Sequence, residues 1–336
     1  MTYRVAVIGA GNLGQTHVTN WMKLKDVMLV GVSASSKSEA EGLAGTAGCP
    51  AFGEGEFDGM LATTKPDIVD ICVPTPSHLS YVERTSARKA AIFVETPLAR
   101  TAAECQAIVD VIEKSGVKCM AGGAGRFCPE FRNAADEVFI GGVGNPGVIR
   151  VARMTGPRSS SSGNWLMDQA QSGGVVLDSM VRDFEWLLHT FGAATRVYAK
   201  GARAQGDAAG LVDYALVTIR FASGAVAHVT GSWAQSAGTV ETILEIAGDR
   251  GLIEYDSTAH RPFTISTGIN GALVSPLQES PLNDQDDPCF LQLQAFIRCV
   301  SENTPIPVTV VEARDATLMA LAALESIETG RVVTLQ

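Results

Sequence analysis

The sequence predicts an α/β protein with two domains: a doubly wound parallel sheet, followed by an α+β domain that contains a large, mostly antiparallel open sheet. Three observations support this prediction. The chain has 336 residues, and domains of roughly 100–200 residues make two domains the expected number. Over residues 1–120, short apolar runs alternate with longer amphipathic segments, which is typical of a parallel sheet covered on both faces. After residue 125, strand-like runs follow one another with few helices between them, which indicates antiparallel pairing.

In the first half, each predicted strand is a short run of β-branched and apolar residues, and each predicted helix has one apolar face. Right-handed crossovers between these elements produce a doubly wound sheet. The predicted strands are Tyr3–Ile8, Met28–Val32, Ile68–Val73, Ile92–Val94 and Val117–Met120, and the predicted helices are Leu13–Leu24, Lys37–Leu43, Ser77–Ala90 and Ala102–Lys114.

The second half has a different pattern of predicted strands and helices. Ser223-Gly224 and Asp249-Arg250-Gly251 predict hairpin turns between adjacent strands. We place the domain boundary so that residues 1–124 form the first domain and residues 125–336 form the second. The predicted strands of the second domain are Val148–Thr155, Thr195–Ala202, Asp213–Phe221, Ala225–Trp233, Thr242–Ala247 and Gly251–Tyr255, and its predicted helices are Glu130–Ile140, Val175–Phe191, Phe290–Glu302 and Val311–Thr329.

Composition and charge exclude several classes of function. The chain carries 26 Lys and Arg against 36 Asp and Glu, a net charge of −10. Such a chain is a poor ligand for nucleic acid or an anionic membrane, although a local basic pocket remains open. Its apolar runs are shorter than the ~20 residues that a membrane span needs, and the first 15 residues lack the pattern of a signal peptide. We therefore expect a cytoplasmic protein.

The cysteines and histidines predict neither disulfides nor a metal site. The seven cysteines are odd in number and contain no Cys-x-x-Cys pair, which indicates reduced thiols. The five histidines show no metal-ligand spacing in the sequence. We therefore expect no bound metal.

A glycine-rich turn is the strongest local signal. It follows the first predicted strand and opens the first helix, which is the context of a dinucleotide-binding turn. Gly9 permits the tight turn, Gly11 lets the backbone approach a pyrophosphate, and Gly14 lets helix and strand pack closely. The alternative is a tight turn without a ligand, which this context disfavours. The predicted binding residues are Gly9, Gly11, Asn12, Leu13 and Gly14.

The end of the second strand indicates which dinucleotide binds. NAD sites usually place an acidic residue there to bind the ribose 2′-hydroxyl. This strand end instead carries Ser33, Ser35, Ser36 and Lys37, and hydroxyls with one lysine suit a 2′-phosphate. The alternative interpretation is that the serines cap the next helix, a role compatible with the first. The sequence therefore favours NADP over NAD.

Two further strand ends contribute to the same edge of the predicted sheet, where open α/β sheets bind their ligands. One is the segment that follows Ile68–Val73, and the other follows Ile92–Val94. A histidine early in a helix is more often a packing or backbone-bonding residue than a base, so we assign the one in this region to the cofactor pocket. The residues assigned to the pocket from these segments are Val73, Pro74, Thr75, His78, Glu95 and Pro97.

Taken together, these residues and several in the second half resemble the Gfo/Idh/MocA family (glucose–fructose oxidoreductase and inositol dehydrogenase). The similarity runs from end to end, and it rests on the order and spacing of its motifs. The resemblance implies a Rossmann domain, an NAD(P)-dependent dehydrogenase acting on sugars, polyols or sugar acids, and a homodimer or homotetramer. The matching segments are Val5–Gly14, Thr75–His78, Glu95–Ala99, Arg126–Pro129, Asn164–Trp165, Ser172–Asp178 and Ser326–Val333.

Two departures from the family pattern concern catalysis. The family usually has Lys at the position of Thr96 and His at the position of Arg182, whereas Asp178 matches the family's aspartate. The resemblance implies that these positions face the nicotinamide, so Asp178, Arg182 and Thr96 are the predicted catalytic residues. We expect Asp178 to be the base, and Arg182, which stays protonated, to hold an anionic or polyhydroxylated substrate.

The helix pattern alone leaves another interpretation open. Asp178 and Arg182 lie four residues apart on the predicted helix, and Glu185 and His189 extend the same polar stripe. Such a stripe is equally typical of a solvent-facing ladder of ion pairs, and only the family resemblance favours a site.

The remaining candidates are weaker. Arg126, Asn164 and Trp165 complete the predicted substrate site, but each is equally compatible with an ordinary interface role. Because the usual Lys and His are replaced, a rival hypothesis is a nucleotide-binding protein with little turnover, acting as a sensor or as the inactive partner of an assembly. Saturable turnover with one substrate distinguishes the enzyme from this rival.

Overall fold

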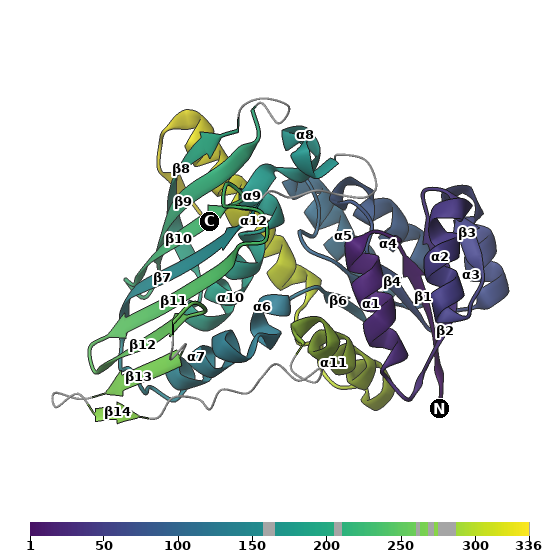
Figure 1. Cartoon of the computed structure of the whole chain (residues 1–336), viewed down its shortest axis with the longest axis horizontal. Helices are drawn as coiled ribbons and strands as arrows, with labels where there is room; N and C mark the ends of the chain where they lie inside the picture. The colour runs from purple at the N-terminus through teal and green to yellow at the C-terminus, as the bar shows by residue number, and fades with distance from the viewer. Residues whose placement is uncertain (157–164, 205–209, 260–262, 268–271, 275–286, 336) are drawn as a thin grey trace. The chain divides into compact units, whose positions relative to one another are not determined.

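The computed structural model describes residues 1–156, 165–204, 210–259, 263–267, 272–274 and 287–335. This part of the chain forms two compact units (Figure 1). Unit 1 holds Met1–Ala124 and the described residues of 160–165 and 284–314, and unit 2 holds the described residues of 125–159, 166–283 and 315–336. Among the described helices, none has both the length and the apolar run that crossing a membrane requires.

Unit 1 is built on a six-stranded parallel sheet in the order β3-β2-β1-β4-β5-β6. The strand order reverses direction between β1 and β4, which creates the switch point where doubly wound sheets bind ligands. The predicted doubly wound fold is confirmed. The strands are β1 (Tyr3–Ile8), β2 (Val27–Ala34), β3 (Ala51–Gly53), β4 (Ile68–Ile71), β5 (Ala91–Val94) and β6 (Cys119–Ala121), and the helices are α1 (Asn12–Met22), α2 (Lys37–Ala47), α3 (Phe57–Thr64), α4 (His78–Ser86) and α5 (Ala102–Ser115).

Three parts of unit 1 differ from the sequence prediction. β3 and α3 were not predicted, because a three-residue strand and an eight-residue helix are too short to show a period. The helix α11 (Pro288–Glu302), which the prediction places in the second domain, packs against α1. The side-chain amide of Asn20 on α1 donates a hydrogen bond of 2.8 Å to the carboxylate of Asp287 at the start of α11, which joins the two helices.

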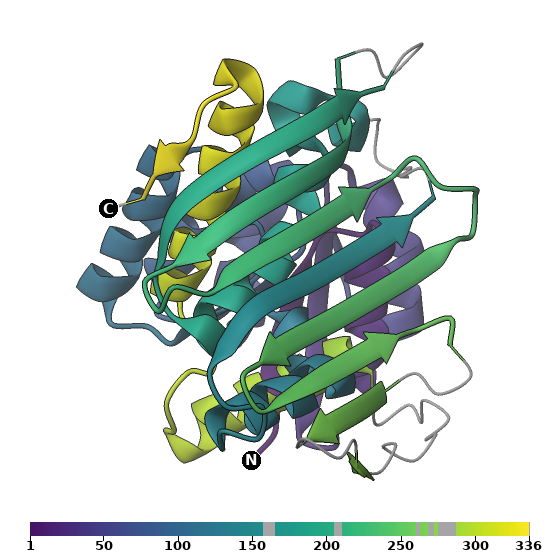
Figure 2. The same ribbon diagram turned by 90° about the vertical axis from the view of Figure 1, so that its left-hand side faces the viewer.

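Unit 2 is built on a nine-stranded sheet in the order β14-β13-β12-β11-β7-β10-β9-β8-β15. β7 and β10 pair in parallel, and the other neighbours are antiparallel. The predicted mostly antiparallel sheet is therefore confirmed, and Figure 2 shows its open face. The strands are β7 (Pro146–Thr155), β8 (Ala194–Arg203), β9 (Val212–Phe221), β10 (Val226–Ser232), β11 (Val240–Gly248), β12 (Gly251–Asp256), β13 (Phe263–Thr267), β14 (Ala272–Val274) and β15 (Val333–Thr334).

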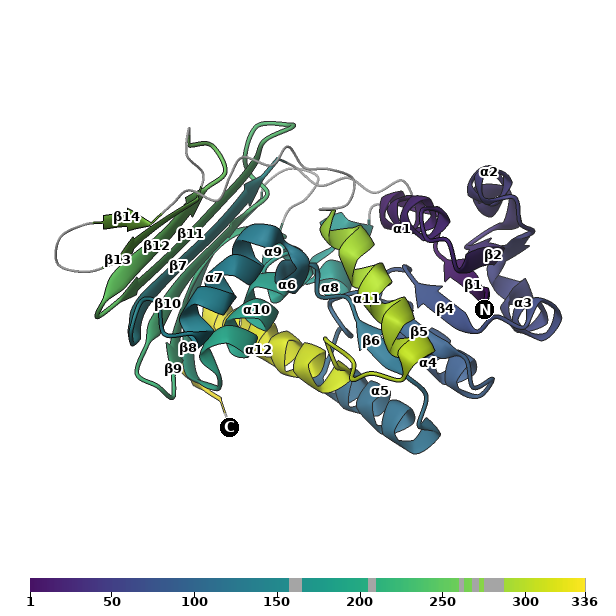
Figure 3. The same ribbon diagram turned by 90° about the horizontal axis from the view of Figure 1, so that it is seen from below.

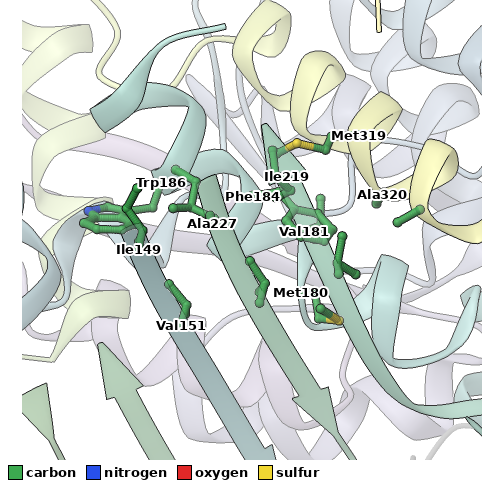
Figure 4. Close-up of a cluster of buried hydrophobic side chains, with 14 of the residues drawn as sticks. Ile149, Val151, Met180, Val181, Phe184, Trp186, Ile219, Ala227, Met319 and Ala320 are labelled. Carbon is green, nitrogen blue, oxygen red and sulfur yellow. The ribbon is translucent and has the colours of Figure 1, made fainter. Parts of the chain in front are cut away.

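The helices of unit 2 cover the other face of this sheet. Figure 3 shows the sheet on edge, with α7, α9 and α10 on one side of it. Between helices and sheet lies an apolar core to which Phe184, Trp186, Ile149 and Ile219 contribute fully buried side chains (Figure 4). The helices that lie wholly or partly in unit 2 are α6 (Ala124–Phe127), α7 (Pro129–Phe139), α8 (Gln169–Ser172), α9 (Gly174–Asp178), α10 (Val181–Phe191) and α12 (Val310–Thr329). Short 3₁₀ turns in the described residues occupy Glu54–Glu56, Thr75–Ser77 and Trp165–Met167.

Candidate active site

The glycine turn after β1 has the geometry that a dinucleotide-binding turn needs. Gly9 has a φ of +111°, and a Cβ there would lie 2.4 Å from the carbonyl oxygen of Cys72. A Cβ on Gly14 would lie 1.9 Å from the carbonyl oxygen of Gly9, so only glycine allows this turn to close. Gly11 precedes α1, where no side chain caps the helix. The N–H groups at Asn12 and Leu13 therefore begin a helix whose positive end suits a pyrophosphate.

The end of β2 brings together the residues predicted to distinguish NADP from NAD. Ser36 caps α2 by accepting the Glu39 N–H at 3.3 Å, as the helix-cap interpretation expects, and Lys37 is the first residue of that helix. Ser35 donates to the carboxylate of Glu39. Ser33 is fully buried, and its hydroxyl has no hydrogen-bond partner among the described residues.

Glu39 is a carboxylate that the sequence analysis missed at this strand end. The expected position for an acidic residue is the strand end itself, whereas Glu39 lies on the first turn of the next helix and reaches back to Ser35. The end of β2 therefore has an acid nearby as well as hydroxyls and a lysine. The Ser-x-x-Glu spacing of Ser36 and Glu39, which is typical of a helix start, was the signal that could have found it.

The end of β4 is braced by His78. Val73 and Pro74 lead into the 3₁₀ turn Thr75–Ser77, where Thr75 is buried. Nδ1 of His78 lies 3.2 Å from the Leu98 carbonyl oxygen, and Nε2 lies 3.0 Å from that of Val73. Burial lowers the pKa of His78, so the ring is neutral. His78 thus connects two loops at the sheet edge, which is the backbone-bonding role that its sequence position favoured.

The end of β5 carries Glu95, Thr96 and Pro97, and the Thr96–Pro97 peptide bond is cis. The Glu95 side chain is 12% exposed, and its Oε1 lies 3.1 Å from Nε2 of His17. Oε2 accepts the Thr96 N–H at 3.2 Å. Glu95 is therefore tied to the interior of unit 1 at one oxygen and to the Thr96 backbone at the other.

A buried polar cluster lies behind this edge, and the sequence analysis missed it. His17 and Asp70 are both fully buried, with Nδ1 of His17 2.8 Å from Oδ2 of Asp70. Cys72 donates to Asp70 Oδ1 at 3.3 Å, and Trp21 donates to Asp70 Oδ2 at 2.6 Å. Between 49 and 55 residues of chain separate His17 and Trp21 on α1 from the Asp70 and Cys72 side chains that they contact. The one signal in the sequence was an aspartate inside an otherwise apolar strand, because a buried carboxylate needs a partner.

The donor atoms of His17, Asp70 and Cys72 all lie within 4.8 Å of one another. That is close enough for a metal ion, but hydrogen bonds among the three already account for their clustering. Burial, reinforced by Asp70, raises the pKa of the Cys72 thiol, which opposes the thiolate that a metal would require. We assign no metal to this cluster.

In unit 2, the predicted helix Val175–Phe191 is wrong as a single helix. It divides into α9, which ends at Asp178, and α10, which begins at Val181. At the break, the Met180 N–H bonds to the carbonyl of Val175, five residues back, at 3.0 Å. The break follows from packing, because Met180 fills the space beside Gly231, where a Cβ would lie 2.5 Å from its side chain.

This break changes the relation between Asp178 and Arg182, which are not neighbours on one continuous helix. Ser179 instead occupies the corner: its hydroxyl donates to Asp178 Oδ2 at 3.4 Å and accepts the Trp233 indole N–H at 2.9 Å. Nε of Arg182 lies 3.5 Å from the Ser179 carbonyl oxygen. Ser179 and Trp233 are therefore residues of this corner that sequence reasoning did not identify.

The rest of the predicted polar stripe is only partly solvent-facing, because His189 is exposed at the end of α10. Glu185 is buried and forms an ion pair with Arg126, so Arg126 is engaged inside unit 2. A second ion pair joins buried Asp183 to half-buried Arg153 at 2.8 Å. The alternative interpretation, a solvent-facing ladder of ion pairs, is wrong at Glu185, because α10 buries that side chain.

The structure says little about the two remaining candidates for the substrate site, Trp165 and Asn164. Trp165 opens a 3₁₀ turn and is half-buried. Asn164 lies outside the described residues.

Comparison with known proteins identifies the family. The model described as "Oxidoreductase family, NAD-binding Rossmann fold" matches residues 3–123, and the model of the "GFO/IDH/MocA C-terminal domain" matches residues 131–254. The chain belongs to the GFO/IDH/MocA oxidoreductase family. The resemblance seen in the sequence is thus confirmed, and this family member is an NAD(P)-dependent oxidoreductase.

Similar proteins cover the whole chain. Inositol 2-dehydrogenase of Rhizobium meliloti (strain 1021) is 26% identical over 340 residues, which cover 100% of both chains. The scyllo-inositol 2-dehydrogenase (NAD(+)) of Bacillus subtilis (strain 168) is 28% identical, over 99% of this chain and 96% of its own. The crystal structure of a myo-inositol dehydrogenase from Corynebacterium glutamicum ATCC 13032 has a TM-score of 0.83 at 24% identity and shares the fold over 100% of this chain and 99% of its own.

Proposed function

We propose that this family member transfers a hydride between a nicotinamide dinucleotide and a hydroxyl or keto group of a polyol or sugar. The observation that carries the proposal is the glycine turn at Gly9–Gly14, which closes only with glycine and leads into a helix start that no side chain caps. Relatives of full length are dehydrogenases of inositols, which supports a polyhydroxylated substrate. The bound dinucleotide supplies the hydride chemistry, and the protein supplies orientation and proton transfer.

We propose further that the preferred dinucleotide is NAD. The serines and Lys37 at the end of β2 favour a 2′-phosphate, but the Glu39 carboxylate bonded to Ser35 repels one and is suited to accept a bond from a 2′-hydroxyl. Titration of the protein with NAD⁺ and NADP⁺ in separate experiments measures the preference. We expect the Kd for NAD⁺ to be at least about tenfold lower, a difference of roughly 1.4 kcal/mol; a lower Kd for NADP⁺ restores the preference that the serines suggested.

The proton of the substrate hydroxyl needs an acceptor, and we assign this role to Asp178. Thr96 carries no charge, and a guanidinium such as that of Arg182 offers donors and no acceptor. The bonds from Trp233 to Ser179 and from Ser179 to Asp178 support the assignment, because they hold the carboxylate in one orientation. Arg182 has a planar guanidinium suited to bind a carboxylate or a pair of hydroxyls, so we assign it to substrate orientation.

Replacement of the proposed base tests the function. In Asp178→Asn, we expect kcat with the best substrate from a panel of inositols, sugars and sugar acids to fall about 10²–10⁴-fold, because general base catalysis contributes that much. The Kd for the dinucleotide stays unchanged. The matched control is Asp136→Asn, an exposed aspartate on α7 of the same unit. Wild-type kcat in Asp178→Asn contradicts the assignment, and dinucleotide binding without turnover on the whole panel favours the sensor hypothesis.

We also propose that the open face of the nine-stranded sheet binds a second copy of this chain. Side chains on β7 and β9 alternate between core and solvent, and Val148 and Leu216 are 47% and 44% exposed. The two sides of the face carry opposite charge. Its basic side is β8–β9 with the exposed Arg196 and Arg220, and its acidic side is β12 with the exposed Glu254. A twofold axis that lies between the two faces and runs parallel to the strands places the basic side of each copy against the acidic side of the other.

A further inference from the structure

Two carboxylates flank one buried imidazole in unit 1. The ring of His17 has Asp70 Oδ2 at 2.8 Å from Nδ1 and Glu95 Oε1 at 3.1 Å from Nε2. His17 comes from α1, Asp70 from β4 and Glu95 from the end of β5, so the chain of three side chains crosses the middle of the sheet. His17 and Asp70 are fully buried, and only Glu95 reaches the edge where the dinucleotide is proposed to bind.

This geometry determines the protonation state of the ring. A neutral imidazole has one N–H, so one of its nitrogens would direct a lone pair at a carboxylate oxygen. The imidazolium carries an N–H at each nitrogen: the one at Nδ1 bonds to Asp70, and the one at Nε2 lies at ion-pair distance from Glu95 without the angle of a hydrogen bond. His78 has a similar arrangement against two backbone carbonyl oxygens, but these carry no net charge, and its pKa is lowered by burial. The full negative charges at His17 are what distinguish the two histidines.

Glu95 is held from several directions. Its Oε1 accepts from Gln292 of α11 at 3.4 Å, and Gln292 in turn accepts the Gly123 N–H at 3.1 Å. Gly122 leaves space for the carboxylate, because a Cβ there would lie 2.6 Å from Glu95 Oε2. That same Oε2 accepts the Thr96 N–H. The orientation of the Thr96 corner therefore depends on Glu95, and that of Glu95 depends on its buried partners.

We infer that Glu95 is a positioning residue: the Asp70–His17 pair, with His17 as an imidazolium, holds the Glu95 carboxylate so that it fixes the Thr96 corner against the nicotinamide end of the cofactor. The inference rests on the proposed function for its catalytic consequence, but its structural core concerns this chain alone. Glu95 acts through Thr96 and does not itself exchange a proton with substrate. The Asp70–His17–Glu95 arrangement acts at the end of β5, where the family usually has a lysine and this chain has the uncharged Thr96.

The titratable groups that face His17 all come from unit 1. They are Asp70 on β4, Cys72 just beyond it, Glu95 after β5 and Cys289 on α11. Burial opposes the charge on His17, but the Asp70 carboxylate outweighs it and places the pKa of the ring well above 6.5. The positioning therefore persists through neutral pH and is lost only when alkaline pH removes the second ring proton.

The first test observes the ring directly and needs no substrate. Nitrogen NMR of the ¹⁵N-histidine-labelled full chain, assigned with His17→Gln, reports both ring nitrogens. We expect both to be protonated at about pH 8, well above the usual histidine pKa of about 6.5. One unprotonated nitrogen at neutral pH overturns the inference whether or not the chain is a dehydrogenase. Failure of wild-type protein to bind either dinucleotide overturns the proposed function and leaves the measured charge of the ring unaffected.

The second test separates positioning from a merely structural role. Glu95→Gln keeps the shape but offers one acceptor where the carboxylate offers two. We expect kcat to fall roughly 10- to 100-fold, the size of effect produced by a small misplacement of reacting groups, with the dinucleotide Kd within about threefold. Glu83→Gln, on the exposed face of α4, is the matched control. Unchanged kcat in Glu95→Gln refutes the positioning role.

The third test uses the pH profile. Asp70→Asn keeps the size of the side chain and removes one of the two charges on His17. We expect the alkaline limb of the kcat profile to move roughly 1–3 pH units lower, the usual effect of a neighbouring opposite charge on a pKa, together with the nitrogen titration of His17. An alkaline limb that stays in place while the ring titrates lower shows that His17 does not control catalysis and refutes the inference. Where Asp70→Asn does not fold, the wild-type ring titration and the wild-type alkaline limb must coincide.

Discussion

At the scale of single residues, the charges in unit 1 are paired across long stretches of sequence. A carboxylate in the middle of a parallel sheet costs several kcal/mol unless a charged partner and hydrogen bonds compensate it. Asp70 has His17, Trp21 and Cys72 as partners. These partners lie close to Asp70 in space and compensate its charge. The strand therefore tolerates an acid although its other residues are apolar.

The His17–Asp70 pair makes the stability of the chain depend on pH. The pKa of His17 is raised in the folded state, so its contribution is complete below the unfolded pKa of about 6.5 and is lost as the pH rises through the folded pKa. We expect the free energy of unfolding in urea to fall by up to ~1.4 kcal/mol per pH unit above neutral pH, and this slope to be absent in His17→Gln. His228→Gln, an exposed histidine on β10, keeps the slope. Equal slopes in wild type and His17→Gln refute the assignment.

Glu39 offers the simplest change of specificity. Glu39→Gln removes the negative charge beside Ser35 while keeping a group that can accept its hydroxyl. We expect the Kd for NADP⁺ to fall about tenfold relative to that for NAD⁺, as measured by calorimetry. Glu41→Gln, two residues further along α2 and exposed, leaves the ratio of the two constants unchanged. A constant ratio in Glu39→Gln shows that the discrimination lies elsewhere.

At the scale of elements, the break between α9 and α10 is the feature that shapes the proposed catalytic corner. A continuous helix would place Asp178 one turn from Arg182, and the break instead gives Asp178 a neighbour in Ser179. Trp233, which follows β10, anchors that neighbour from the sheet. The position of the base therefore depends on packing between helix and sheet.

Removal of the Ser179 hydroxyl tests this corner. In Ser179→Ala, the buried Trp233 N–H loses its acceptor, which costs about 1–3 kcal/mol of stability, and Asp178 loses a donor. We expect kcat to fall roughly tenfold while the dinucleotide Kd stays the same. Ser232→Ala removes another buried hydroxyl of the same unit and lowers stability without this loss of kcat. Equal kcat values in the two variants contradict a role for Ser179 in orienting Asp178.

At the scale of the whole molecule, the proposed self-association depends on the open face of the sheet in unit 2. Apolar side chains such as Tyr214 and Leu216 are exposed there, although a sheet of this breadth usually covers such residues. The acidic and basic sides of the face suit a twofold arrangement, in which each basic side meets an acidic one.

Leu216→Glu tests that surface. A charge placed at a twofold interface is buried in both copies, and an uncompensated buried charge costs about 3–5 kcal/mol, so we expect dimer dissociation to be roughly 100-fold or more easier. Sedimentation velocity across a concentration series measures it. Ile140→Glu, at a residue that is 76% exposed beyond the end of α7, leaves the association unchanged. A wild-type chain that sediments as a monomer at all concentrations refutes the proposal.

Several features followed from local sequence alone. The apolar strands, the helices between them and the glycine turn depend on periodicity and on the backbone freedom of Gly9 and Gly14, and the structure has them where the sequence predicted. The hairpin at Ser223-Gly224 depends on the same kind of local chemistry, with Gly224 at a φ of +95°. Order and spacing of short motifs also sufficed to identify the family.

Other features were decided only by tertiary contacts. The pairing of His17 with Asp70 and Glu95 joins three elements whose order in the sequence says nothing about their distance in space. The helix break at Ser179 follows from a methionine that fills the space beside a glycine on β10, and the burial of Glu185 follows from the ion pair with Arg126. Periodicity reports which face of an element is apolar, whereas burial of charge depends on which distant side chain can compensate it, and that is known only once the chain is folded.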